Sequence, residues 1–280
     1  MRGPFQFLAT VALIAGVNIA FLRFDTVSWR TVAFLATAAL LILLLRQFGL
    51  ALTGHAAGVL IDGRNRISLD RLQVMAWTVL TTAVLVVAAA SNLAGVGGPL
   101  PPGTSPLDIT IPQFLLAALG ISSATLAASP LILSTRPVAD PARSAAQAAA
   151  GPADSAAVFT RETSQQADWT DIVQGEEVGN AATVDLGKVQ QIFFTLLVLG
   201  AYTAEVFAAF RVEAPVTALP EPSETFLYLM GISHASYLAY KGVPKTAARG
   251  GLRATAAPAP STAASPAPAS PAPEGASGPG

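Results

Sequence analysis

Long apolar runs are the feature that most constrains this chain. A helix needs about 20 residues to cross the ~30 Å hydrocarbon core of a bilayer. The 280-residue sequence contains six runs that approach or reach this length, and only 12% of its residues are charged, about half the fraction typical of a soluble domain. The sequence therefore predicts an all-α membrane protein with about six transmembrane helices, at residues 5–22, 31–50, 72–91, 112–133, 191–210 and 225–240.

The first two runs each carry a feature that needs an explanation. A signal peptide is an alternative interpretation of the first run, because Arg2 precedes it. No small-x-small cleavage pattern follows, however, and Arg23 comes directly after the run, so we expect a retained helix. Arg46 interrupts the second run near one end, a depth from which an arginine side chain can reach the interface.

The positions of Lys and Arg predict the orientation. With six spans, thirteen of the sixteen Lys and Arg residues fall on one side, and only Arg23, Arg30 and Arg211 fall on the other. Cytoplasmic loops carry the excess of positive charge, so we expect a multi-pass membrane protein with both termini in the cytoplasm. No basic surface is large enough to suggest a nucleic-acid partner. The absence of cysteine does not indicate a compartment.

Two segments of the chain resemble each other. Residues 67–80 align without gaps on residues 184–197, and a second match joins Gly120-Ile121-Ser122 to Gly231-Ile232-Ser233. Each unit contains two helices, so the copies have the same orientation and form a parallel internal repeat about the membrane normal. Chance similarity between apolar helices is the alternative. The polar and aromatic matches at fixed spacing favour duplication: Leu69/Leu186, Arg71/Lys188, Gln73/Gln190, Trp77/Phe194 and Thr78/Thr195.

These patterns predict six regions. They are an N-terminal transmembrane hairpin (1–50), a cytoplasmic connector (51–71), hairpin repeat A (72–135), a cytoplasmic linker with a short structured element near 168–180 (136–187), hairpin repeat B (188–245), and a disordered Ala/Pro/Ser tail (246–280).

Polar residues inside apolar helices are the first group of candidate site residues. Gln73 and Gln190, with Thr78 and Thr195, occupy repeated positions. Lipid cannot satisfy an amide, so the two glutamines could pair across the pseudo-twofold axis; glutamines wetted at the cytoplasmic interface are the alternative. His234 lies near the middle of the last run and is either a proton-relay or ligand-contact residue or a neutral, hydrogen-bonded core histidine.

Glu205 completes this group. It either approaches His234 or faces the interface.

The second group lies on the predicted cytoplasmic face. Asp168 or Thr170 could cap a short helix with an apolar edge that includes Trp169. We expect this element to lie against the membrane surface or against the segment that carries Arg64 and Arg66. Glu176 and Glu177 match no EF-hand spacing and have no histidine nearby, so we expect no metal site. The candidate cytoplasmic interaction residues are Trp169, Glu176, Glu177, Arg64 and Arg66.

Residues 58–77, 175–195 and 231–241, about a fifth of the chain, resemble segments of uncharacterised bacterial multi-pass membrane proteins. The shared strings are Ser-Leu-x-Arg-x-Gln and Gly-Glu-Glu-x-Gly-Asn. The resemblance implies a bacterial inner membrane and supplies no activity and no catalytic or binding residue.

Three function classes follow from the sequence. The first is a non-enzymatic membrane platform or accessory subunit that presents cytoplasmic elements to a protein partner. The second is a subunit of a small-solute or ion channel or transporter, which would need to form a homo-oligomer. The third, an intramembrane enzyme, lacks its motifs, since the sequence has no His-Glu-x-x-His, Gly-x-Ser-x-Gly, Walker motif or paired intramembrane aspartates. We expect the platform, with membrane lipid as a partner and no catalytic residue, metal or cofactor.

Overall fold

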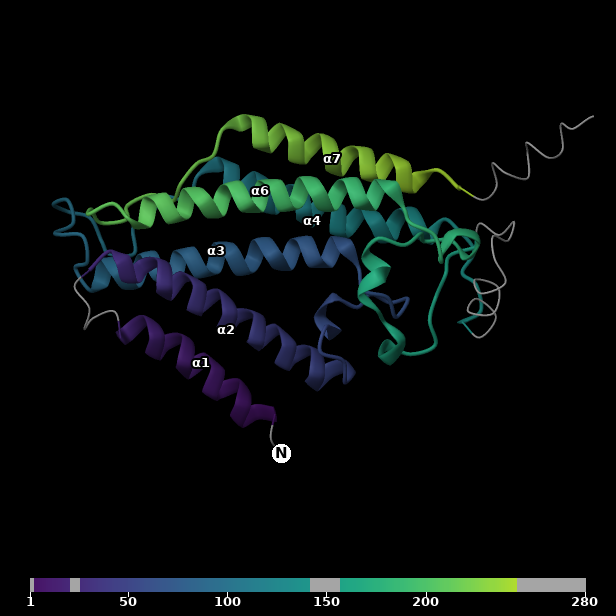
Figure 1. Cartoon of the computed structure of the whole chain (residues 1–280), viewed down its shortest axis with the longest axis horizontal. Helices are drawn as coiled ribbons and strands as arrows, with labels where there is room; N and C mark the ends of the chain where they lie inside the picture. The colour runs from purple at the N-terminus through teal and green to yellow at the C-terminus, as the bar shows by residue number, and fades with distance from the viewer. Residues whose placement is uncertain (1–2, 21–25, 142–156, 246–280) are drawn as a thin grey trace, which may run out of the picture.

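The computed structural model describes residues 3–20, 26–141 and 157–245, and within them it is all-helical, with no β-strand. Every predicted span is an α-helix (Figure 1). The six long helices are α1 (Gly3–Ala20), α2 (Ser28–Thr53), α3 (Leu69–Leu93), α4 (Gln113–Ser134), α6 (Leu186–Phe210) and α7 (Glu224–Gly242). Residues 142–156 of the predicted linker region and the whole predicted tail 246–280 lie outside the described residues.

Four of the described helices, α2, α3, α4 and α6, are long and apolar enough to cross a membrane. The apolar part of α1 is shorter, at Gln6–Ala20, and α7 carries Glu224, His234 and Lys241 within its 19 residues. Large apolar side chains, among them Leu116, Phe193 and Leu196, point out of the bundle. An α-helix pairs most backbone N–H and C=O groups of its interior within itself, as a segment in lipid requires. The four apolar helices indicate a membrane-embedded protein.

The helices α3 and α6 begin with the same kind of cap. Ser68 accepts a hydrogen bond from the backbone N–H of Arg71, and Asp185 accepts one from that of Lys188 (3.2 Å). A side-chain oxygen at this position satisfies one of the backbone donors that a helix start leaves free. Both helices have 25 residues, and each starts at the leucine that the alignment matches, Leu69 or Leu186.

The core lies where α2, α3, α4, α6 and α7 meet. Its centre is an aromatic trio in which Trp77 contacts Tyr202 (6.0 Å between ring centroids) and Phe114 stacks on Tyr202 (6.1 Å). Trp77 is almost fully buried, whereas its aligned counterpart Phe194 is only half-buried. The packing of the two hairpins is therefore not identical at this position.

A buried arginine closes the end of the bundle at which α2 begins. The Arg30 guanidinium donates to the Ser91 hydroxyl (2.6 Å), to the carbonyl oxygen of Val212 (3.0 Å) and to that of Val96. Gly97 lies in the same joint with φ +89°, and a Cβ there would come within 2.5 Å of the Ala214 carbonyl oxygen. Only glycine fits both that φ angle and that approach. The joint holds the start of α2 and the loops after α3 and α6 together.

Candidate functional site

A folded polar layer covers the opposite end of the bundle, and we call it the cap. It consists of residues 58–68, before α3, and residues 157–185, before α6. Figure 1 shows it beside the starts of α3 and α6. The cap contains single antiparallel bridges, such as Ile61 with Ile67 and Val158 with Glu177, and short 3₁₀ turns. Its shape therefore depends on side-chain contacts more than on regular secondary structure.

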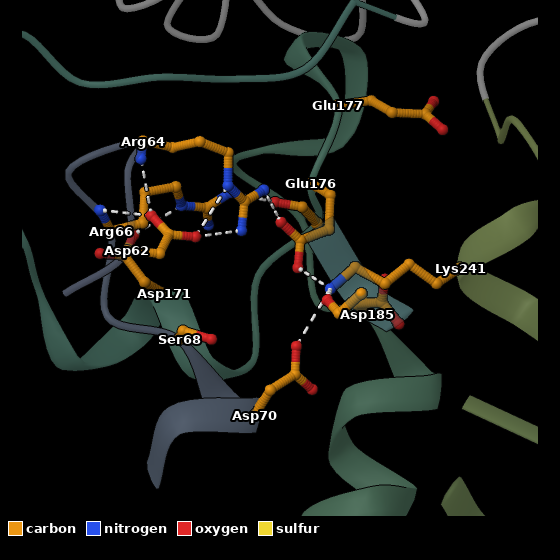
Figure 2. A network of polar contacts seen from close by, with 12 residues as sticks. Asp62, Arg64, Arg66, Ser68, Asp70, Asp171, Glu176, Glu177, Asp185 and Lys241 are labelled. Atoms are coloured by element: carbon orange, nitrogen blue, oxygen red, sulfur yellow. Dashed lines mark hydrogen bonds and ion pairs between the residues drawn. The ribbon is translucent and has the colours of Figure 1, made fainter. Parts of the chain in front are cut away.

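Glu176 is the hub of these contacts. Its carboxylate forms ion pairs with Arg64, with Lys188 (2.8 Å) and with Lys241 (3.2 Å), while its side chain is only 6% exposed. Figure 2 shows Glu176 between Arg64 and Lys241. The three cations belong to the connector before α3, to the start of α6 and to the end of α7. One carboxylate thus joins three elements that are far apart in the sequence.

Asp171 forms a second centre. It is fully buried and contacts Arg66 (3.1 Å) and Arg161 (2.7 Å), and it accepts from the backbone N–H of Ile67 (3.3 Å). The 3₁₀ turn η4 (Trp169–Ile172) positions it, because Asp168 caps the turn and the Asp171 side chain accepts from the Asp168 N–H (2.9 Å). Of the two predicted capping residues, Asp168 and Thr170, it is Asp168 that caps the turn, which ends at Ile172.

Further ion pairs hold the cap to the ends of α4 and α7. Glu177 pairs with Arg136 (2.6 Å) and accepts from the backbone N–H of Lys245 (3.0 Å), and Lys245 pairs with Asp185. Lys241 also contacts the Tyr237 hydroxyl (2.8 Å), Ser129 and, at 3.5 Å, Asp70. The ends of all four helices of the two hairpins are therefore connected through the cap.

The charges of the cap stabilise one another. Burial alone would raise the pKa of Glu176, but Arg64, Lys188, Lys241 and Arg66 lower this pKa well below its usual value. Burial opposes ionisation of Asp171 too, and here the charge of Arg66 and hydrogen bonds from Asp168 and Arg161 lower the net pKa. Burial would lower the pKa of Arg64, and its acidic neighbours Glu176 and Asp62 raise it. Both carboxyl groups and Arg64 are therefore charged at neutral pH.

The structure corrects the predicted role of three cytoplasmic candidates. Arg66, Glu176 and Glu177 are buried in ion pairs, so they are not available as a contact surface for another protein. Arg64 is mostly buried as well, and only Trp169 is exposed, at 55%. Of the two predicted locations of the 168–180 element, the structure shows the one against the Arg64/Arg66 segment.

The predicted pairing of Gln73 with Gln190 is wrong. Gln73 Nε2 donates instead to the Thr195 hydroxyl (2.6 Å), and Gln190 is exposed. The buried amide of α6 belongs to the next residue, Gln191, whose Oε1 accepts from Ser233 (2.5 Å). The reason is the helical period, since Lys188, Gln191 and Val198 are buried on one face and a residue one position earlier lies about 100° away. The helical period therefore offered a sequence-based signal that Gln191, and not Gln190, is the buried amide of α6.

The other intramembrane candidates lie apart from one another. His234 is buried, and its Nδ1 lies 2.7 Å from the Thr125 hydroxyl. That hydroxyl donates its proton to the Ile121 carbonyl (3.0 Å), so His234 Nδ1 is the donor toward it. Thr78 is exposed and bonds its own helix at Val74. Glu205 is exposed too. Of the two readings of His234, this geometry favours the hydrogen-bonded core histidine.

The arrangement as a whole pairs the buried charges with one another. Within the described residues, no three His, Asp or Glu side chains converge where they could hold a metal ion. The carboxylates of the cap and Asp70 of α3 are matched by Arg and Lys from five different segments: Asp62, Asp70, Asp171, Glu176, Glu177 and Asp185 against Arg64, Arg66, Arg136, Arg161, Lys188, Lys241 and Lys245. No family model, no curated protein and no solved structure matches the chain.

Proposed function

We propose that the protein is a non-enzymatic platform of a bacterial inner membrane that presents the cap to a partner protein in the cytoplasm. It spans the membrane six times in this proposal, and α3–α4 and α6–α7 are duplicated hairpins. The observation that carries the proposal is the ion-pair network around Glu176, which joins the two segments of the cap and attaches them to α6 and α7. A surface held rigidly in this way loses little conformational entropy when it binds a partner.

The outer side of the cap suits this role. Residues 162–170 include exposed polar side chains, among them Glu162, Thr163 and Thr170, while Asp171 beneath them is fully buried. Water-exposed polar groups on an ordered backbone are typical of the rim of a protein interface. The partner-facing surface therefore lies on this outer segment and not on the buried carboxylates.

The interior of the bundle argues against a pore through one molecule. Beyond Trp77, the described core is filled by Val84, Val87, Val206 and Phe210, each 0% exposed. The Arg30 joint then closes the far end. The half of the core next to the cap contains polar side chains, whereas the other half is apolar and closely packed. A charged solute that crossed the bundle would have to lose its hydration in the apolar half.

A channel or transporter subunit is the second candidate, and one observation favours it. Several buried polar atoms between α3, α4, α6 and α7 have no hydrogen-bond partner: Asp70 Oδ1, Gln73 Oε1, Ser122 Oγ and Gln191 Nε2. Buried polar groups in proteins are nearly always paired with protein or ordered water. These atoms suit a hydrated region, and a homo-oligomer would have to supply the rest of a path.

Photocrosslinking in native membranes tests the platform. A photoreactive residue at Thr163, on the outer side of the cap, should form a discrete adduct with another protein. The matched control is Leu116, which is exposed on α4 and should yield lipid adducts. Glu176→Gln, which loosens the cap, should reduce the Thr163 adduct. No protein adduct at Thr163, together with solute flux through liposomes that contain the purified protein, would reject the platform and support the transporter.

The cysteine-free sequence permits a direct test of the orientation. Glu162, in the cap, and Glu213, in the loop after α6, are both exposed, and each is replaced by cysteine in a separate variant. A thiol reagent that cannot cross the membrane should label Glu213→Cys in spheroplasts and label Glu162→Cys only after lysis. The reverse pattern would place the cap outside the cytoplasm.

A further inference from the structure

A large apolar groove lies between α2, α3 and α6 at the cap end of the bundle. Its volume is about 630 Å³, within the roughly 300–1,000 Å³ typical of sites that enclose a small ligand. Figure 1 shows the reason for the space, because α2 diverges from α3 toward its C-terminal end. The walls include Leu45 of α2, Met75 and Val79 of α3 and Leu199 of α6. An acyl chain suits such a wall.

The cap forms the roof of this groove. Trp169 of η4 lines it, and its exposure of 55% leaves much of the indole surface free. The carbonyl oxygen of Thr53, at the end of α2, accepts from Ser164 Oγ (3.2 Å) and from Gln165 Nε2 (2.9 Å). The end of α2 is therefore attached to the cap, and the width of the groove is set at this end.

Two basic side chains lie at the same groove. Arg46 of α2 lines it and is exposed, and within the described residues it forms no ion pair, unlike Arg64 or Lys188. His55 lines the groove too, and its Nδ1 accepts from the Ala57 N–H (3.1 Å). That bond leaves Nε2 as the nitrogen that carries the proton. An arginine near the end of a membrane span reaches water or anionic headgroups at the interface, and the lining of the groove contains neither an Asp nor a Glu that could pair with Arg46.

We propose that this groove binds an anionic phospholipid, with an acyl chain between α2, α3 and α6 and the phosphate at Arg46 and His55. A phosphodiester with an apolar tail supplies in one molecule the two features that the groove lacks, an apolar filling and a negative charge. Trp169 lies where tryptophan is enriched, beside the headgroup at the membrane surface. Arginine binds phosphate through its planar fork of N–H donors. This site is independent of the partner proposed for the outer side of the cap.

Binding is measured on the purified full-length protein in detergent, by native mass spectrometry during titration with phosphatidylglycerol or with phosphatidylcholine of the same acyl chains. One phosphatidylglycerol should bind in preference to phosphatidylcholine. Arg46→Gln should weaken phosphatidylglycerol binding by about fivefold or more and leave phosphatidylcholine binding unchanged. The matched control is Arg211→Gln, an exposed arginine at the other end of α6, which should change neither.

Ala76→Phe narrows the groove from α3 and should weaken the binding of both lipids. Three results would overturn the site. Equal affinity for the two lipids, unchanged by Arg46→Gln, would mean that no headgroup is recognised. An equal loss in Arg211→Gln would mean general attraction of anionic lipid to a basic protein. A dimer that Ala76→Phe dissociates, without bound lipid, would make a second copy of the chain the occupant. None of these results depends on whether Thr163 crosslinks to a protein.

Discussion

Replacing Glu176 by glutamine should detach the cap from the helix bundle. Glutamine has nearly the same volume, so the change removes the charge while the packing stays similar. It leaves Arg64, Lys188 and Lys241 without the carboxylate that they share. Removing one partner of a buried ion pair costs about 3–5 kcal/mol. Because the glutamine oxygen still accepts a hydrogen bond, we expect about 3 kcal/mol, which is roughly a hundredfold increase in the equilibrium constant for opening of the cap.

Limited proteolysis in detergent micelles measures this opening. At low protease concentration, cleavage follows the equilibrium population of the open form. We expect cleavage between residues 157 and 185 to be about a hundredfold faster in Glu176→Gln than in the wild type. Glu162→Gln is the matched control, because Glu162 is exposed on the same segment and forms no ion pair within the described residues. A surface substitution of this kind changes stability by about 0.5 kcal/mol or less.

A double-mutant cycle separates the ion pairs from other effects of the substitution. Lys188→Met should destabilise the cap, and combining it with Glu176→Gln should cost clearly less than the sum of the two single changes, because the double variant leaves fewer uncompensated charges. Wild-type cleavage rates in Glu176→Gln would refute the assignment of Glu176 as the hub. Strict additivity of the two changes would refute the coupling on which the magnitude rests.

The remaining predictions concern pH and two helix joints. Because the pKa of Glu176 is lowered in the folded protein, the charged carboxylate stabilises the cap at pH values above the unfolded-state pKa of about 4.3. This stability is lost as the pH falls through the folded pKa. Protease resistance should therefore stay constant from neutral pH to about pH 5 and fall in stronger acid, and the fall should be smaller in Glu176→Gln. Gln73→Leu and Thr195→Val should each lower thermal stability by about 0.6–2 kcal/mol and should not be additive; independent effects would contradict their hydrogen bond. Arg30→Met should destabilise the protein by roughly 2–4 kcal/mol, because it orphans buried carbonyl groups. Gly97→Ala should act on the same joint, and faster hydrogen exchange at residues 94–98 is the readout for both.

The sequence by itself determined the helices and their nature. An apolar run long enough to cross a bilayer has to pair its own backbone groups, so its helical state is a local property, and all six predicted runs are helices. The capping of the 3₁₀ turn η4 by Asp168 is local too, because a side-chain oxygen at that position bonds N–H groups only two or three residues away. Such features are independent of what the rest of the chain does.

Only the tertiary structure decided which polar side chains meet. The alignment matches Gln73 to Gln190, but packing against α3 and α7 buries the next residue, Gln191, instead. Arg66 meets Asp171 at a sequence separation of 105 residues, and Arg64 meets Glu176 at 112. From the sequence alone, these arginines cannot be distinguished from any other basic residue that flanks a membrane span on the cytoplasmic side. Their burial follows from the fold of the cap, since a charge leaves water only where an opposite charge is held at hydrogen-bonding distance.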